Sequence, residues 1–472
     1  MCGIKTIQAF TYNMDRRKFL KLFSGGALLT TAGLVGCKTE TTSTDDSSAS
    51  LGEIPTDSMT YRTGKHGERV SLLGYGCMRW PTVAGTSARD TDSDIDQEEV
   101  NRLVDYAIEH GVNLFDTSPA YCKGFSERAT GIALKRHPRE SFYISTKLSN
   151  FSPDLWSYKE SVAMYHRSFE SLQVDTIDFY LLHGIGMGGM EQLQKRYIEN
   201  GVLDFLLEER EKGHIRNLGF SYHGDVGCFD YMLANNDKYK WDFVLIQHNY
   251  VDWSHAKEVN PRNTNSEYLY TQLAEHGIPV FVMEPLLGGR LASLNDYSTS
   301  QMKQREPQRS VASWAMRFAG NQPMILSVLS GMTYMEHLQD NLRSFCPHKP
   351  LSDDELLMLE HIAQNYVSYP VIPCTSCQYC MPCPYGIDIP TIFAHYNKSL
   401  NQGNIITDTA DSNYESARRR FLVAYDRKVP RERQADHCIG CSTCRQHCPQ
   451  RIDIPRQMRR IDALAEQLRR KK

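Results

Sequence analysis

Gly111-Val-Asn-Leu-Phe-Asp-Thr-Ser-Pro-Ala-Tyr121 runs from a short apolar segment directly into polar residues. Short apolar or β-branched runs that end at polar residues are typical of buried strands. Seven more runs of this kind occur along the chain, so the sequence predicts eight strands. They span residues 70–75, 112–115, 142–146, 177–182, 215–220, 243–247, 279–283 and 324–329.

Segments with helical periodicity separate these runs, for example residues 98–109 and 158–172. Alternation of strands and helices favours a parallel sheet. No Gly-x-Gly-x-x-Gly follows the first run, which disfavours a doubly wound sheet that binds a dinucleotide. About 300 residues are available, the usual size of a (β/α)8 barrel. We therefore predict an α/β fold, a (β/α)8 TIM barrel over residues 59–350.

Four chemically suited side chains follow three successive runs, namely Asp116, Tyr121, Lys147 and His183. In such barrels the chemistry lies at the carboxyl ends of the strands, so we expect these groups to share one mouth. Each residue alone has an ordinary alternative: a core phenol, a helix cap, a surface charge, a core histidine. Their joint occurrence favours a catalytic site.

Eight of the fourteen cysteines lie in two runs near the C-terminus. The runs are Cys374-x2-Cys377-x2-Cys380-x2-Cys383-Pro384 and Cys438-x2-Cys441-x2-Cys444-x3-Cys448-Pro449. This spacing is typical of 4Fe-4S clusters. Each run continues as x-x-Ile-Asp-Ile-Pro, which indicates a duplicated unit. We predict two clusters in a mainly helical, ferredoxin-like domain over residues 351–472.

Zinc sites and disulfides also use paired cysteines, but zinc takes four ligands, usually from two separated pairs, and an unbroken run of four divides poorly. The runs resemble those of two-cluster ferredoxins, where the fourth cysteine binds the other run's cluster. That resemblance implies one set of Cys374, Cys377, Cys380 and Cys448, and another of Cys438, Cys441, Cys444 and Cys383. The first run has two residues before its last cysteine instead of three, so the connectivity stays open.

The N-terminal segment resembles an export signal. Arg16-Arg17 precedes an apolar stretch at 22–36, too short for a membrane span, and Cys37 closes a lipobox-like sequence. We predict a twin-arginine lipoprotein signal over residues 1–37, with Met14 as the true start of translation. A disordered tether is predicted over residues 38–58. An amphipathic surface helix is the alternative, which the glycines disfavour. The protein is then expected on the periplasmic face of a membrane.

The barrel residues resemble the aldo-keto reductases, in particular the branch with a C-terminal ferredoxin-type domain. Besides 111–121, the matching motifs include Thr146-Lys147, Leu181-Leu-His-Gly184 and Met283-Glu-Pro-Leu-Leu-Gly-Gly289. The resemblance implies that Tyr121 is the general acid for a carbonyl oxygen and that His183 orients the carbonyl. A free phenol has a pKa of about 10, and an ammonium at Lys147, held by Asp116, would lower it.

The resemblance also implies a nicotinamide nucleotide site. Its residues would be Ser221, Gln247, Leu286, Gly288, Gly289, Gly331, Asp340 and Asn341. Gly331 and His337 occupy places where many NADPH-dependent members have Lys and Arg, so NADP and NAD both remain candidates. A flavin in the barrel mouth is the alternative, because clusters pass one electron at a time whereas hydride transfer moves two together.

Composition gives the remaining expectations. The formal net charge of −3 and the scattered basic residues disfavour nucleic acid as a partner. We expect a small carbonyl substrate (aldehyde, ketone or sugar), a redox partner protein, and membrane contact only through a lipid at Cys37. The alternative function is an electron carrier or ligand-binding regulator in which the four barrel residues are not catalytic.

Overall fold

The computed structural model describes residues 52–88, 93–368 and 371–470. The predicted export signal, Cys37 and most of the predicted tether lie outside the described residues. Among the residues that are described, no helix is both long and apolar enough to cross a membrane.

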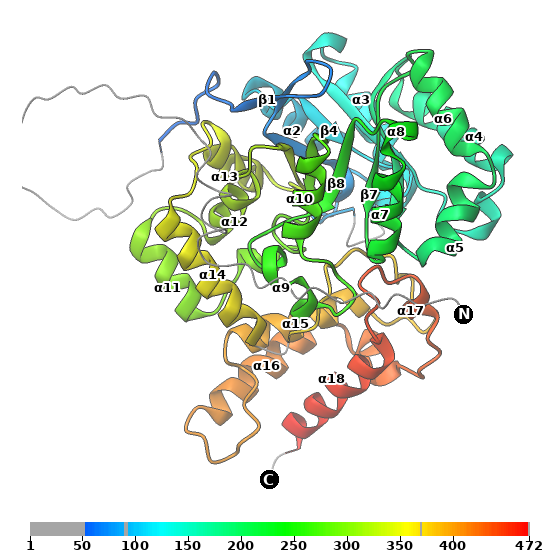
Figure 1. Ribbon diagram of the computed structural model, residues 1–472. Helices are drawn as coiled ribbons and strands as arrows, with labels where there is room; N and C mark the ends of the chain where they lie inside the picture. Colours follow the sequence, from blue (N-terminus) through cyan, green and yellow to red (C-terminus); the bar gives the residue numbers. More distant parts are fainter. Residues whose placement is uncertain (1–51, 89–92, 369–370, 471–472) are drawn as a thin grey trace, which may run out of the picture.

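Eight parallel strands close into a barrel, which confirms the predicted fold (Figure 1). Neighbouring strands in the closed order pair in sequence, and the last strand pairs with the first. The strands are β3 (Leu73–Gly76), β4 (Leu114–Asp116), β5 (Tyr143–Leu148), β6 (Ile177–Ile185), β7 (Ile215–Tyr222), β8 (Phe243–Gln247), β9 (Val280–Met283) and β10 (Ile325–Ser330).

The first predicted strand was wrong in one respect, because residues 70–75 divide between two strands. β2 (Arg69–Ser71) pairs antiparallel with β1 (Tyr61–Thr63), and only β3 joins the barrel. Val70 packs with inward-facing residues such as Phe179 and Phe281. The β1–β2 hairpin therefore closes the amino end of the barrel and leaves the carboxyl end open.

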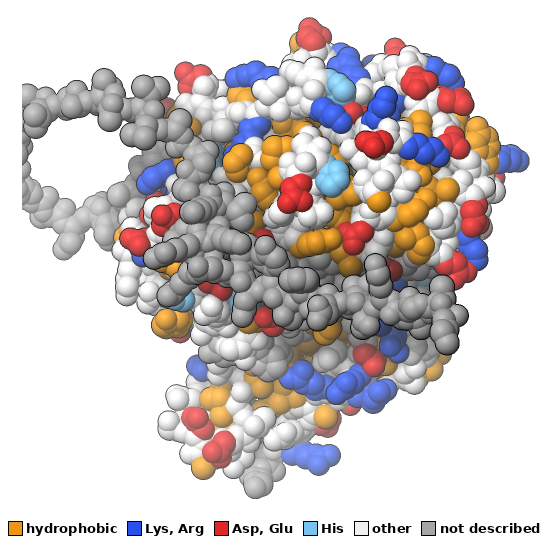
Figure 2. Space-filling model, viewed as in Figure 1, with side chains coloured by type: hydrophobic (Ala, Val, Ile, Leu, Met, Phe, Trp, Pro, Cys, Tyr) orange, Lys and Arg blue, Asp and Glu red, His pale blue; other side chains and the backbone are white. Residues whose placement is uncertain are grey.

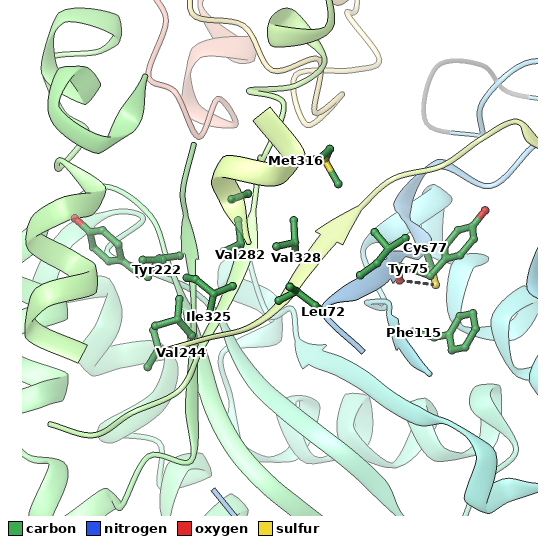
Figure 3. Packing of buried hydrophobic residues seen from close by; sticks show 14 of the residues in the cluster. Leu72, Tyr75, Cys77, Phe115, Tyr222, Val244, Val282, Met316, Ile325 and Val328 are labelled. Atoms are coloured by element: carbon green, nitrogen blue, oxygen red, sulfur yellow. Dashed lines mark hydrogen bonds between the residues drawn. The ribbon is translucent and has the colours of Figure 1, made fainter. Parts of the chain in front are cut away.

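Helices cover the outside of the barrel. The main ones are α2 (Gln97–Glu109), α3 (Ser126–Leu134), α4 (Tyr158–Leu172), α6 (Val202–Glu211), α7 (Val226–Ala234), α10 (Ser266–Glu275), α12 (Val311–Ala319) and α13 (Met335–Phe345). Side chains on alternate strand positions face outward and pack against them; Figure 3 shows Val244, Val282 and Val328 in this layer, with Met316 of α12. α4 begins where the sequence predicts, since Ser157 accepts a hydrogen bond from the backbone N–H of Glu160.

Both predicted boundaries of the barrel domain need correction. Ile54 is already part of the barrel's hydrophobic core, so the packed body begins before residue 59. At the other end α14 (Asp353–Ser368) packs its apolar face against α9 (Asp252–Val259) and α11 (Asp296–Arg305). Because α14 buries its apolar residues in the barrel core, the second domain begins after it.

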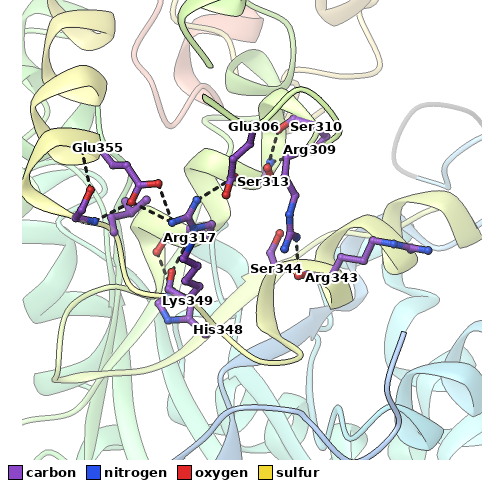
Figure 4. A network of polar contacts seen from close by, with 12 residues as sticks. Glu306, Arg309, Ser310, Ser313, Arg317, Arg343, Ser344, His348, Lys349 and Glu355 are labelled. Atoms are coloured by element: carbon purple, nitrogen blue, oxygen red, sulfur yellow. Dashed lines mark hydrogen bonds and ion pairs between the residues drawn. The ribbon is translucent and has the colours of Figure 1, made fainter. Parts of the chain in front are cut away.

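Buried Arg317 ties α14 to the barrel (Figure 4). Its guanidinium donates to Glu306 at 3.1 Å and to both carboxylate oxygens of Glu355 at 3.2 Å. Its Nε donates to the carbonyl oxygen of Lys349 at 3.2 Å. One buried cation thus joins α11, α12 and the start of α14.

The C-terminal domain has its own hydrophobic core and groups on one side of the barrel (Figure 1). Its helices are α15 (Ile389–Asn401), α16 (Tyr414–Lys428), α17 (Thr443–Gln446) and α18 (Ile454–Arg469). The repeated Ile-Asp-Ile-Pro sequence starts α15 and α18. Asp388 and Asp453 accept from backbone N–H groups three residues on, and proline occupies the first turn.

Candidate active site and cysteine quartets

A cavity of about 620 Å³ opens at the carboxyl ends of the strands, and Asp116, Tyr121, Lys147 and His183 all line it. We call it the mouth cavity. Asp116 ends β4, and Tyr121 begins the short helix η2 (Tyr121–Gly124). Lys147 and His183 lie within β5 and β6, not after them as predicted, because pairing with neighbouring strands continues beyond both residues.

Lys147 and Asp116 form a buried ion pair. Nζ of Lys147 lies 2.7 and 2.6 Å from the two carboxylate oxygens of Asp116, and it also donates to the carbonyl oxygen of Thr117 at 2.8 Å. The hydroxyl of Ser145 donates to the same carboxylate at 2.7 Å. Burial lowers the pKa of Lys147, and the attraction of Asp116 opposes that shift. The pair holds an ammonium group 4.8 Å from the ring centroid of Tyr121.

His183 is held neutral and oriented. Burial, followed by the charge of Lys147, lowers its pKa well below the usual value. Its Nδ1 lies 2.6 Å from the hydroxyl of Ser149, which in turn bonds the hydroxyl of Ser118 at 2.7 Å. The imidazole stands edge-on to Tyr121, with ring centroids 6.0 Å apart.

Ser149 was missed by the reasoning from sequence. It follows Lys147 by two positions, and alternate residues of a strand face the same side, so its position was the available signal.

Most of the predicted nucleotide residues line the same cavity. They are Ser221, Leu286, Gly288, Gly289, Gly331, Asp340 and Asn341. Three already have internal partners: the hydroxyl of Ser221 accepts from the N–H of Gly184 at 2.8 Å, Asp340 accepts from Ser310 at 2.6 Å, and Asn341 donates to Ser330 at 2.8 Å. These bonds fix the side chains at the wall of the cavity.

Gln247 is not among the residues that line the mouth cavity. Its Nε2 donates to the carboxylate of Asp252 at 2.5 Å. Asp252 is buried and also accepts a hydrogen bond from the side chain of Asn249, so its carboxylate is a strong acceptor that binds the Gln247 amide.

Arg79 supplies a cation that the sequence pattern did not reveal. It lines the cavity beside Gly331 and His337. A Cβ added to Gly331 would stand 2.9 Å from Cδ of Arg79, so the absence of a side chain at Gly331 gives the arginine stem its place. Burial lowers the pKa of His337, and the charge of Arg79 adds to that effect. The cavity therefore runs from the Lys147–Asp116 pair to an end where Arg79 lies among the carboxylates of Glu336 and Asp340.

The eight C-terminal cysteines surround two hollows. Cys374, Cys377, Cys380 and Cys448 line one, which we call the proximal quartet. Cys383, Cys438, Cys441 and Cys444 line the other, the distal quartet. The structure thus brings together the two crossed sets that the ferredoxin resemblance implied, although the first run is one residue shorter.

Each quartet brings four thiols to one hollow, the number of thiolate ligands that a 4Fe-4S cluster takes. Across the described part of the chain, no three His, Cys, Asp or Glu side chains converge as the ligands of one metal ion do. Burial raises the pKa of Cys374 to about 12 and that of Cys444 to about 11. Four neighbouring thiolates need compensating positive charge, which the irons of a 4Fe-4S cluster supply.

The proximal quartet adjoins the mouth cavity. Cys377, Thr375 and Gln450 line both the proximal hollow and the mouth. The ring of Tyr379 lies 5.8 Å from that of Phe151, which lies 4.7 Å from the imidazole of His183. One wall of the candidate active site is therefore built by the segment that carries the cysteines.

A second cavity of about 690 Å³ lies beside the mouth, with His223 and Pro449 lining both. Its wall includes the charged residues Asp225, Lys257 and Arg262. Although it is the larger cavity, the ion pair and the proximal quartet both adjoin the mouth, so we place the chemistry there.

Known proteins resemble this chain along the barrel. The sequence model of the Aldo/keto reductase family matches residues 73–364, and that of the 4Fe-4S dicluster domain matches residues 373–452. Protein tas of Escherichia coli (strain K12) is 25% identical over 348 residues, 64% of this chain and 96% of that protein. The uncharacterized oxidoreductase YqkF of Bacillus subtilis is 24% identical over 322 residues, 63% of this chain and 94% of its own.

Among solved structures, the holo form of aldo-keto reductase AKR11C1 from Bacillus halodurans has a TM-score of 0.50 and 22% identity. The match covers 64% of this chain and 96% of that one, and it supports the barrel fold. The barrel fold, the match to the 4Fe-4S dicluster domain and the match to the Aldo/keto reductase family over most of the chain agree with one another. The chain belongs to the aldo/keto reductase family.

Proposed function

We propose that this oxidoreductase interconverts a small carbonyl compound (an aldehyde, ketone or sugar) and the corresponding alcohol by hydride transfer. The observation that carries the proposal is the buried ammonium of Lys147, paired with Asp116 and 4.8 Å from the ring centroid of Tyr121. A cation at this place favours the phenolate, so Tyr121 can give a proton to the carbonyl oxygen or take it back.

The other two residues of the set have supporting roles. Asp116 keeps the Lys147 ammonium in place and charged in a site where burial alone would favour the neutral amine. His183 is neutral, and Ser149 occupies its Nδ1, so Nε2 is the nitrogen available to bond the substrate oxygen. The second cavity adjoins the mouth at His223 and would receive the remote part of a longer substrate.

A nicotinamide nucleotide would supply or accept the hydride. Ser221, Gly288, Gly289 and Asn341 would hold it along the mouth cavity, with Arg79 at the end next to Gly331. Arg79 favours NADP over NAD, because a 2′-phosphate pairs well with a guanidinium. A flavin is the alternative carrier in the same cavity.

The two quartets would hold two 4Fe-4S clusters, one each. Each cluster exchanges one electron, so the pair together matches the two electrons of a hydride. The adjacency of Cys377 to the mouth cavity supports coupling between cluster and site. Export by the twin-arginine route and a lipid at Cys37 complete the proposal, and both rest on the N-terminal sequence alone.

The test starts from protein purified anaerobically after assembly in the cytoplasm. About eight irons and eight sulfides per chain are expected, together with a released nicotinamide or flavin. Tyr121→Phe should then lose turnover on carbonyl substrates while the iron and sulfide contents stay unchanged. If the variant keeps its turnover, Tyr121 is not the proton donor, and the carrier or regulator function takes its place. Zinc without sulfide would exclude the clusters.

A further inference from the structure

The two quartets differ in their access to solvent. In the proximal quartet Cys448 is buried, and Cys377 faces the mouth cavity. In the distal quartet Cys441 is exposed. Ile439 and Tyr385, which line the distal hollow, are 64% and 46% exposed. A macromolecule can therefore reach the distal quartet at Cys441, whereas no cysteine of the proximal quartet is exposed.

The quartets are also neighbours. Ile389 and Ile454 line both the proximal hollow and the distal hollow. The arrangement gives one order from the surface inward: distal quartet, proximal quartet, mouth cavity. Electrons that enter from outside the protein would arrive at the distal end.

The surface around the distal quartet is basic. Residues 431–460 contain seven arginines against three carboxylates. The arginines are Arg431, Arg433, Arg445, Arg451, Arg456, Arg459 and Arg460, and all seven are exposed. Figure 2 shows basic side chains gathered over α18 on the face in view. We call residues 431–460 with Tyr385 the distal surface.

Two of these arginines stand beside the exposed cysteine loop. A Cβ added to Gly440 would lie 3.5 Å from Nη1 of Arg459. Arg445 directly follows Cys444. Among the residues that the structure describes, neither guanidinium has an ion pair or hydrogen bond with another side chain, so their charge is available to a partner.

We propose that the distal surface binds a protein that carries a one-electron redox group behind an acidic face, and that electrons pass between this partner and the distal quartet. Ile439 and Tyr385 give an apolar centre and the arginines a charged rim, the pattern of a small, transient redox interface. In each transfer the partner loses one electron and the cluster gains it, or the reverse, and no bond forms or breaks. The inference rests on the proposed cluster content.

The test uses a small acidic 2Fe-2S ferredoxin as the probe and the double variant Arg445→Glu/Arg459→Glu. The matched control is Arg419→Glu/Arg427→Glu, two exposed arginines on α16 that change the net charge equally. Binding of the two oxidised proteins is measured by calorimetry, and electron transfer from reduced ferredoxin by stopped flow. We expect both to weaken about tenfold or more in the double variant, with less than a twofold change in the control.

Rising salt should slow the reaction of the unaltered protein. Iron and sulfide are measured first in every variant, so a missing cluster counts against the proposed function and not against this surface. If Arg445→Glu disturbs cluster assembly, Arg459→Glu alone replaces the double variant, since it lies on α18 outside the cysteine runs. Equal rates in the double variant and the control would overturn the inference. So would unchanged ferredoxin binding with lost binding to phosphatidylglycerol vesicles, which would assign the surface to a membrane.

Discussion

Gly288 of the barrel lies directly against Thr375 of the cysteine segment: a Cβ added to Gly288 would stand 2.5 Å from the Cα of Thr375. Thr375 is buried and follows Cys374 immediately. The loop after β9 and the loop that carries Cys374 and Cys377 therefore touch through their backbones, and only glycine allows that approach. This contact joins the mouth cavity to the proximal quartet, so the position of any cluster there depends on it.

The variant Gly288→Ala should separate the two domains locally. The new methyl group would collide with backbone, which costs about 1–3 kcal/mol in addition to the strain of an alanine at a φ of +69°. Thermal unfolding and the electron paramagnetic resonance signal of the reduced clusters measure the effect. Gly289→Ala is the control, because Gly289 also has a positive φ but no atom within 4 Å of its added Cβ. Equal losses in both variants would mean that the contact with Thr375 is unimportant.

The buried ion pair allows structural and catalytic roles to be separated. Lys147→Met leaves the Asp116 carboxylate buried without its cation and should cost about 3–5 kcal/mol of unfolding free energy. Lys147→Met/Asp116→Asn removes both charges and should recover much of that loss. Turnover should fall about 10²–10⁴-fold in both variants, because neither has a cation near Tyr121.

Denaturant unfolding gives the stabilities, and steady-state rates on one carbonyl substrate give the turnover. Recovery of turnover together with stability in the double variant would show that Lys147 acts only through the fold.

Much of the fold followed from short-range pattern. Seven of the eight apolar runs match barrel strands and the eighth does so in part, because most residues of these strands are apolar and buried. The one misassigned run, 70–75, is equally apolar, but Val70 fills the amino end of the barrel and turns its strand out of the sheet. Local composition does not distinguish these two kinds of burial.

The site residues divide in the same way. Asp116, Lys147 and His183 could be named because the strand ends bring them together whatever the intervening loops do. Arg79 and Ser149 could not be named from the sequence. The role of Arg79 depends on its contact with Gly331 and that of Ser149 on its contact with His183, each more than thirty residues away. Gln247 does not line the mouth cavity, and its amide donates to Asp252, a partner five residues on that the strand pattern does not reveal.

Stability should fall as the pH drops below neutral. Burial lowers the pKa of six histidines, His183, His223, His248, His337, His348 and His395. For His248 it lies at about 3. Below about pH 6.5 the unfolded chain takes up protons that the folded protein does not, so each such histidine removes about 1.4 kcal/mol per pH unit until its folded pKa is reached.

His248→Phe should therefore flatten the dependence of unfolding free energy on pH between about 6.5 and 4 by that amount. Urea unfolding of the barrel at a series of pH values measures the slope. His276→Phe, at an exposed histidine, is the control. The same slope in all three proteins would show that His248 accepts a proton without loss of the fold.

Arg79 should decide the choice between the two nicotinamide nucleotides. Arg79 lines the mouth cavity, and its stem lies against Gly331, where an added side chain would collide with it. Arg79→Gln should weaken NADPH binding about 10- to 100-fold, the loss of a charge-assisted bond to phosphate, and NADH binding far less. Fluorescence titration with both nucleotides measures this, with His337→Gln as the control on the same wall. A larger loss in the histidine variant, or equal losses for both nucleotides, would remove Arg79 from this role, whereas no binding of either nucleotide to the unaltered protein would point to a flavin.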